Sequence, residues 1–235
     1  MGILRKKPNH NLKTYPSDNF QLLQPWSVPI LKTVLPENIL KSFLDLSEKV
    51  LNDPNSKSYG HQLAGEIQNE KYIDSSLIDF FNLKPYLTSI LNKFIVQCKM
   101  QMFPELSVEK VKKNSYIIEL CTMWIVNQRP GEYNPLHMHN DTISSVLYLK
   151  VPNKLPPIKN KDSDGSIVFY NAGTRDLEFS RTILKCEPKV GELYIFGSNQ
   201  QHAGYPYRSN DLNAERISIS FNANFTDMPG NTILG

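Results

Sequence analysis

The stretch Tyr116-Ile-Ile-Glu-Leu-Cys-Thr-Met-Trp-Ile-Val-Asn127 decides the fold class of this chain. It is rich in β-branched and aromatic residues, which favour extended strands. Shorter runs of similar character follow it, separated by turn residues such as Asp164-Gly165. The further expected strands are 143–151, 166–170, 181–187, 192–197 and 216–224. Short strands at regular spacing, joined by Gly, Pro and Asn turns, are typical of an antiparallel sandwich or barrel, so the sequence predicts a mainly β jelly roll.

Two helices are expected before these strands, at about 36–52 and 85–102. The first has a proline in its first turn, where the missing N–H costs nothing, and both carry apolar residues at helical spacing. Residues 1–30 are polar and interrupted by prolines, which indicates an extended N-terminal arm. Residues 31–235 then form a single domain, with a jelly-roll core at about 108–225 and the helices flanking it.

The composition bounds the class of protein. Hydrophobic residues make up 40% of the chain, which is enough for a real core, and the formal net charge of +3 gives no reason to expect nucleic acid. No apolar run approaches the roughly 18–20 residues that span a bilayer. Three cysteines without a CxxC spacing indicate free thiols in a reducing compartment. We therefore expect a cytoplasmic protein, in the host cytoplasm if the chain is viral.

Histidines point to a metal site. The chain has five of them, and the segment Gly131-Glu-Tyr-Asn-Pro-Leu-His137-Met-His139-Asn-Asp141 holds two. In an extended strand, residues i and i+2 point to the same face, so both imidazoles can reach one ion. A third, His202, follows another strand-like run. A lone histidine would more often hydrogen-bond a loop, but His-x-His with a distant histidine in an all-β frame favours a metal.

The segment Arg216-Ile-Ser-Ile-Ser-Phe221 indicates an anion-binding strand. Strand alternation puts Arg216, Ser218 and Ser220 on one face and the apolar residues on the other. An arginine inside a small barrel needs an anionic partner, and a dicarboxylate could supply it through the guanidinium fork, with a hydrogen bond from Ser218. The alternative is an edge strand with an exposed polar face.

Together these motifs resemble the Fe(II)- and 2-oxoglutarate-dependent oxygenases. The motifs are Gly131 followed six residues on by His137, a strand ending in Tyr148-Leu, a Gly-x-Leu-x-x-Phe strand, a distal histidine and Arg-x-Ser. The resemblance is closest to the prolyl-hydroxylase-like branch and to phage or bacterial enzymes of this family. It covers about residues 116–225 and implies a double-stranded β-helix, the family's form of the jelly roll, supported by N-terminal helices.

For the metal, the resemblance implies that His137 and His202 are iron ligands. The family usually has His-x-Asp where this chain has His-x-His, which leaves two hypotheses. In the favoured one, His139 is the third ligand. In the other, the register slips, His139 and Asp141 form the pair, and His137 stands behind them.

For the co-substrate, the resemblance implies that Arg216 and Ser218 bind the distal carboxylate of 2-oxoglutarate. Tyr148 could add its hydroxyl there. Asn127, on the strand before the Gly131 turn, is a weaker candidate for the other end of the molecule.

The resulting function is that of a dioxygenase. With Fe(II), 2-oxoglutarate and O2, it would hydroxylate a small-molecule or peptide substrate and release succinate and CO2. Two alternatives remain open: a cupin-like three-histidine metal-dependent dioxygenase that does not use 2-oxoglutarate, and a non-catalytic jelly-roll binding or structural protein. The sequence names no substrate, no oligomeric state and no membrane partner.

Overall fold

The computed structural model describes residues 20–23, 29–102, 116–156, 164–171 and 182–227. Most of the expected arm 1–30 therefore lies outside the described residues. Its described part includes β1 (Phe20–Leu23), which pairs antiparallel with β2 (Ile30–Val34).

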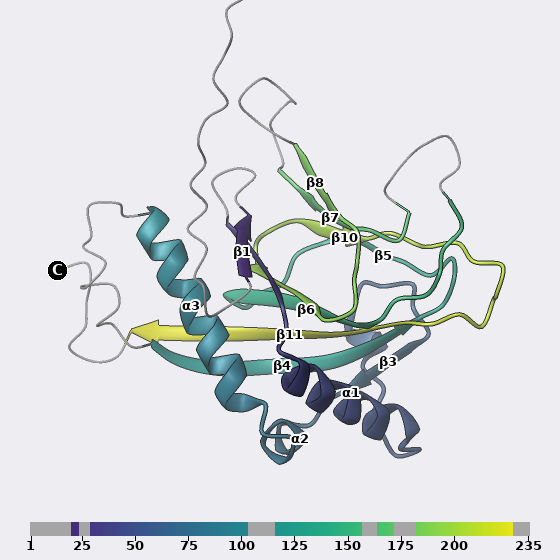
Figure 1. Ribbon diagram of the computed structural model, residues 1–235, viewed down its shortest axis with the longest axis horizontal. Helices are drawn as coiled ribbons and strands as arrows, with labels where there is room; N and C mark the ends of the chain where they lie inside the picture. Colours follow the sequence, from purple (N-terminus) through teal and green to yellow (C-terminus); the bar gives the residue numbers. More distant parts are fainter. Residues whose placement is uncertain (1–19, 24–28, 103–115, 157–163, 172–181, 228–235) are drawn as a thin grey trace, which may run out of the picture.

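Eight strands form the jelly roll, and every connection between successive strands except that between β7 and β8 passes between two antiparallel sheets (Figure 1). They are β4 (Tyr116–Gln128), β5 (Asn134–His137), β6 (Ile143–Lys150), β7 (Ile167–Tyr170), β8 (Ile183–Cys186), β9 (Glu192–Gly197), β10 (His202–Gly204) and β11 (Arg216–Asp227). The seven-stranded major sheet has the order β1-β2-β9-β6-β11-β4-β3, and the four-stranded minor sheet has the order β5-β10-β7-β8. This connectivity confirms the double-stranded β-helix expected from the resemblance.

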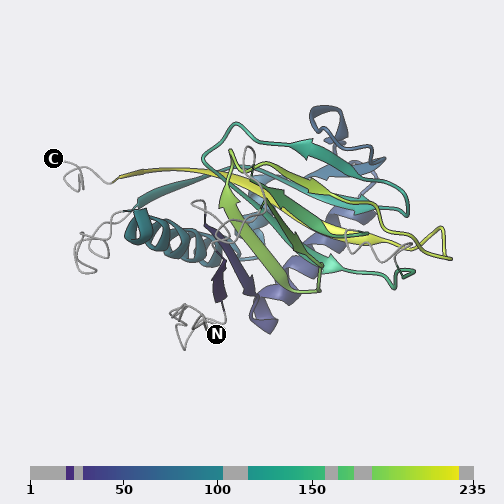
Figure 2. The ribbon, with the colours of Figure 1, turned by 90° about the horizontal axis from the view of Figure 1, so that it is seen from above.

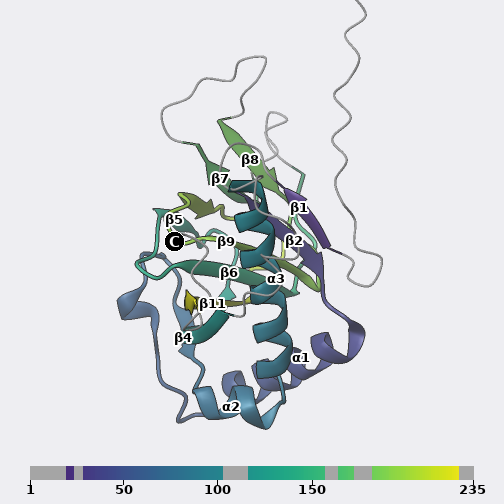
Figure 3. The same ribbon diagram turned by 90° about the vertical axis from the view of Figure 1, so that its left-hand side faces the viewer.

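Helices cover the outer face of the major sheet, and the minor sheet lies on its other side (Figures 1 and 3). They are α1 (Glu37–Asn52), α2 (Ser75–Phe80) and α3 (Lys84–Met102). The segment between α1 and α2 contains a 3₁₀ turn at Gly60–Gln62 and the edge strand β3 (Asn69–Tyr72). Seen from above, β4 and β11 extend past the rest of the sheet on the side where α3 lies (Figure 2). No helix in the described part of the chain is long and apolar enough to cross a bilayer.

Two faces of the major sheet have different roles, and β11 shows this most clearly. Ile219 and Phe221 are buried in the large apolar cluster that the helices share with the sheet. Arg216 and Ser218 alternate with them and therefore face the space between the two sheets. The same alternation in β6 directs Leu147 to the helices and Tyr148 to the interior. The interior between the sheets is thus where polar side chains can meet.

Candidate metal centre

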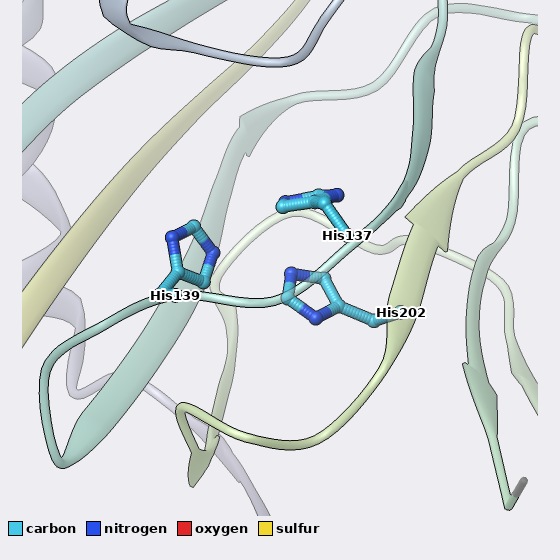
Figure 4. Close-up of side chains that lie close together, drawn as sticks. All are labelled: His137, His139 and His202. Carbon is cyan, nitrogen blue, oxygen red and sulfur yellow. The ribbon is translucent and has the colours of Figure 1, made fainter.

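Three histidines meet at the mouth of the jelly roll (Figure 4). His137 ends β5, His139 follows two residues later, and His202 begins β10, directly opposite His137 in the antiparallel pair. The ring centroid of His137 lies 4.2 Å from that of His202 and 5.0 Å from that of His139. One ligand nitrogen from each ring lies within 4.8 Å of the others, close enough to hold one metal ion.

His139 reaches this cluster by a different route from the one expected. β5 ends at His137, so strand alternation does not place His139 beside it. Instead the backbone N–H of His139 donates to the carbonyl of Ser198 at 3.0 Å, and its ring lies 6.0 Å from that of Trp124. The loop between β5 and β6 is therefore attached to the end of β9, and this attachment directs His139 inward.

Hydrogen bonds fix the tautomer of two rings. The Nδ1–H of His137 donates to the carbonyl of Pro135 at 2.7 Å, and the Nδ1–H of His202 donates to the carbonyl of Gln200 at 2.8 Å. Since a carbonyl can only accept, the proton of each ring is on Nδ1 and the lone pair is on Nε2. Such backbone partners are typical of histidines that bind metals.

All three rings are neutral near physiological pH. Burial lowers the pKa of His202 to about 3 and that of His139 to about 4, and in both cases the neighbouring His137 lowers it further. Burial also lowers the pKa of His137. Each ring therefore offers an unprotonated nitrogen, as metal binding requires.

Asp141 is not part of the cluster. The side-chain amide of Asn224 donates to its Oδ1 at 3.3 Å, at the outer end of β11. Within the described residues, the one group of histidine, cysteine and acidic side chains placed to hold an ion is His137, His139 and His202. The geometry thus favours the three-histidine hypothesis over the slipped register.

The three histidines open into a cavity of about 180 Å³ between the sheets. Arg216 and Ser218 from β11 and Tyr148 from β6 line it, as the sequence predicted. Burial raises the pKa of Tyr148 to about 12, with the nearby charge of Arg216 acting in the opposite direction, so its hydroxyl remains a hydrogen-bond donor. The structure therefore gathers six of the seven predicted site residues around one cavity.

Arg216 is a buried cation that donates its hydrogen bonds to neutral acceptors. It is 5% exposed, and burial lowers its pKa. Its Nε and Nη2 donate to Oε1 of Gln128, its Nη1 donates to the carbonyl of Gly165, and its Nη2 also donates to the carbonyl of Tyr205 at 3.2 Å. All of these acceptors are neutral. Among the described residues no carboxylate forms an ion pair with Arg216, so its charge is left for a ligand.

Asn127 is the predicted site residue that the structure does not bring to the cavity. It follows Val126, a wall residue, and so points to the helix-covered face, where its Nδ2 donates to Oε1 of Glu215 at 2.9 Å. The sequence reasoning overlooked the next residue, Gln128, which is opposite Arg216 in the β4–β11 pair. The signal that could have identified Gln128 is that directly paired residues of neighbouring strands point to the same face of the sheet as each other, here Arg216 and Gln128.

The wall near the metal centre includes residues of the segment between α1 and α2, for which the sequence predicted no role. Gln62, Leu63 and Ala64 line the cavity, together with Trp124 and Met138. No charged side chain is among these five. Such loop residues carry no periodic pattern, so they give no signal in the sequence.

Residues 122–222 match the family described as "Putative 2OG-Fe(II) oxygenase". The segment therefore resembles the 2OG-Fe(II) oxygenases. It runs from β4 to β11 and contains all three histidines and Arg216. The resemblance inferred from the motifs is thereby confirmed for this segment. No curated protein matches the sequence.

Solved structures of low sequence identity resemble this chain. A prolyl-4-hydroxylase from Pseudomonas putida is 14% identical, with 88% of this chain and 93% of that one covered and a TM-score of 0.47. The viral collagen prolyl hydroxylase of Paramecium Bursaria Chlorella virus-1, in complex with 2OG, is 16% identical, with coverages of 83% and 94% and a TM-score of 0.45. HygX from Streptomyces hygroscopicus, with nickel and 2-oxoglutarate bound, is 11% identical, with coverages of 88% and 82% and a TM-score of 0.46.

Proposed function

We propose that this chain is an oxygenase that binds Fe(II) through His137, His139 and His202, binds 2-oxoglutarate through Arg216, Ser218 and Tyr148, and hydroxylates a substrate that remains to be identified. The observation that carries the proposal is the buried, unneutralised guanidinium of Arg216 in the same cavity as three neutral imidazoles.

The donor set suits iron. Neutral imidazoles are good ligands for Fe(II), and three ligands leave positions for a co-substrate and O2. The backbone carbonyls that hold His137 and His202 keep both Nε2 atoms available. Bound there, Fe(II) supplies the oxidative chemistry: 2-oxoglutarate is decarboxylated to succinate and CO2 with O2, and the substrate is hydroxylated.

Charge favours a dianionic co-substrate. Three neutral histidines leave both positive charges of Fe(II) uncompensated, and Arg216 adds a third in the same cavity. 2-Oxoglutarate carries two carboxylates, one for each positive centre. A monoanion would leave one of the two unpaired in a site that is largely shielded from water.

The chain's own side chains can hold the distal carboxylate. Nη1 of Arg216 carries two N–H groups: one donates to the carbonyl of Gly165, and the other has no acceptor among the described residues. The hydroxyls of Ser218 and Tyr148 are on the same cavity wall. The sequence suggested a guanidinium fork, but most of the fork is occupied, so one N–H and these hydroxyls do the binding.

Apolar side chains exclude water around this end of the cavity. Val146, Ile167 and Phe196 line it and are at least nine-tenths buried. A dry wall strengthens the attraction between Arg216 and a carboxylate. The other end, at Gln62–Ala64 and Met138, is uncharged, and we propose that a small-molecule or peptide substrate enters there.

We also propose a cytoplasmic location. All three cysteines are free thiols, as expected of a reducing compartment.

The test is an anaerobic calorimetric titration of 2-oxoglutarate into the Fe(II)-loaded protein. Wild type should bind it, and Arg216→Gln should weaken binding by about 100-fold, since a charge-assisted contact is lost. The control is Arg208→Gln, which removes a half-exposed arginine paired with Asp164 and should bind as wild type does. Unchanged binding by Arg216→Gln would contradict the proposed anchor.

The same titration addresses the alternative enzyme. Stoichiometric iron with no 2-oxoglutarate binding by wild type would overturn the proposal. It would favour a three-histidine dioxygenase that binds its substrate directly to the metal, for which the absence of a carboxylate from the cluster is the supporting observation.

A further inference from the structure

Gln128 accepts two hydrogen bonds from the guanidinium of Arg216. It ends β4, is 4% exposed and is opposite Arg216 in the antiparallel pair. Its Oε1 accepts from both Nε, at 3.1 Å, and Nη2 of the guanidinium. A single amide oxygen thus holds one edge of the arginine fork.

Bonds on the other side fix the orientation of this amide. Its Nε2 donates to the carbonyl of Glu132, so the oxygen must point to Arg216. The main-chain carbonyl of Gln128 accepts from Tyr207 Oη at 3.0 Å, and the ring of Tyr207 lies 5.5 Å from Cζ of Arg216. The amide cannot turn over without placing N–H groups against a cation.

A carboxylate at this position would have nearly the same shape and would accept the same two N–H groups. It would also supply a negative charge next to Arg216, which has only neutral acceptors at present. The carboxamide provides the geometry without the charge, so the guanidinium is held in place and remains positive.

The acidic residues nearby are occupied elsewhere. The carboxylate of Glu132 accepts from the backbone N–H groups of Arg129, at 2.7 Å, and Gln68, at 3.2 Å. Glu215, although adjacent to Arg216 in sequence, pairs with Arg129 at 3.1 Å and Lys150 at 2.9 Å. Asp164, beside Gly165, pairs with Arg208 at 3.0 Å. Within the described residues, the side chain that accepts hydrogen bonds from this cation is thus the neutral amide of Gln128.

We propose that Gln128 is a specificity-determining residue: its uncharged amide positions Arg216 without neutralising it, which makes the pocket select a 2-oxo acid with a distal carboxylate over one without. This inference rests on the proposed function, because it concerns the same co-substrate site. It predicts that one isosteric change, Gln128→Glu, converts Arg216 into half of an internal ion pair and removes that selectivity.

The test compares two 2-oxo acids on the Fe(II)-loaded protein under anaerobic conditions. 2-Oxoglutarate has the distal carboxylate, and 2-oxovalerate has a methyl group in its place. Calorimetry measures the tighter complexes and ligand-observed NMR the weaker ones. In Gln128→Glu, 2-oxoglutarate should bind about 10-fold more weakly or worse, since a charge-assisted contact is lost, while the affinity for 2-oxovalerate is retained.

A matched pair of shorter side chains separates charge from shape. Gln128→Asn and Gln128→Asp have nearly the same shape and differ in charge and in the NH2 donor of the amide, and the aspartate variant should show the larger loss of 2-oxoglutarate affinity. They also keep the comparison available if Gln128→Glu does not fold. Thermal unfolding of every variant without ligand identifies a general loss of structure.

Two results would overturn the inference. One is equal 2-oxoglutarate affinity in the charged and uncharged variants. The other is a parallel loss of both 2-oxo acids in Gln128→Glu, which would indicate a merely structural role. Failure of the wild-type protein itself to bind 2-oxoglutarate is a different result and contradicts the proposed function first.

Discussion

Glu70 provides the most quantitative prediction. It lies in the edge strand β3 and is 1% exposed, and neither carboxyl oxygen has a hydrogen-bond partner among the described residues. Burial, and secondarily the charge of Glu132, raises the pKa of Glu70 from 4.5 to about 7. A buried carboxylate without a partner is costly, so the folded protein holds this group protonated at mildly acidic pH.

The size and sign of the effect follow from linkage. The unfolded chain releases the proton near pH 4.5 and the folded chain near pH 7. The free energy of unfolding therefore falls as pH rises between these values, by about 3 kcal/mol in total at roughly 1.36 kcal/mol per pKa unit. The full penalty is present above the folded pKa and absent below the unfolded one.

The perturbation is Glu70→Gln, which keeps the shape of the protonated acid and cannot ionise. Urea unfolding should show it more stable than wild type by about 3 kcal/mol at pH 8 and by less than about 1 kcal/mol at pH 5. Glu66→Gln, an exposed residue of the same segment, is the control and should change little at either pH. An equal effect of Glu70→Gln at both pH values, or destabilisation at pH 8, would refute the reasoning.

Three further substitutions test the cavity and its support. Ser218→Ala should weaken 2-oxoglutarate binding by about 10-fold in calorimetry, because one hydrogen bond to a carboxylate is lost; unchanged affinity would remove Ser218 from the anchor. Asn127→Ala should leave that affinity unchanged, since its amide bonds Glu215 on the helix-covered face, and a loss comparable to that of Ser218→Ala would contradict this placement. Phe221→Ala should destabilise the fold by roughly 3–5 kcal/mol in urea unfolding, because the ring is 1% exposed between sheet and helices. A cost below about 1 kcal/mol would indicate that the cluster is loosely packed.

The polar and apolar alternation of the last strand made the placement of Arg216 and Ser218 predictable. Arg216 and Ser218 share a face by strand geometry alone, and that face is the cavity wall. The same rule, applied across the β4–β11 pair, explains why Asn127 lies away from the cavity wall and Gln128 lies on it. Along one strand, side chains alternate strictly between the two faces. Which residue of the neighbouring strand lies opposite Arg216 depends on the register of the pair, which this sequence does not specify by itself.

The sequence predicted which three histidines lie together, but not how the backbone brings them together. β5 and β10 have only four and three residues, too few for a compositional signal. His139 is directed inward by a backbone bond to Ser198, a contact between segments far apart in sequence. The three-histidine and slipped-register hypotheses have identical sequence support, because only the folded loop separates His139 from Asp141.

The most direct test of the three-histidine iron centre is the iron content of two single variants. Each is loaded with Fe(II) anaerobically, desalted and analysed for metal beside wild type, with thermal unfolding to confirm the fold. The structure predicts that Asp141→Ala retains stoichiometric iron and that His139→Ala loses it. Retention by His139→Ala together with loss by Asp141→Ala would contradict the account.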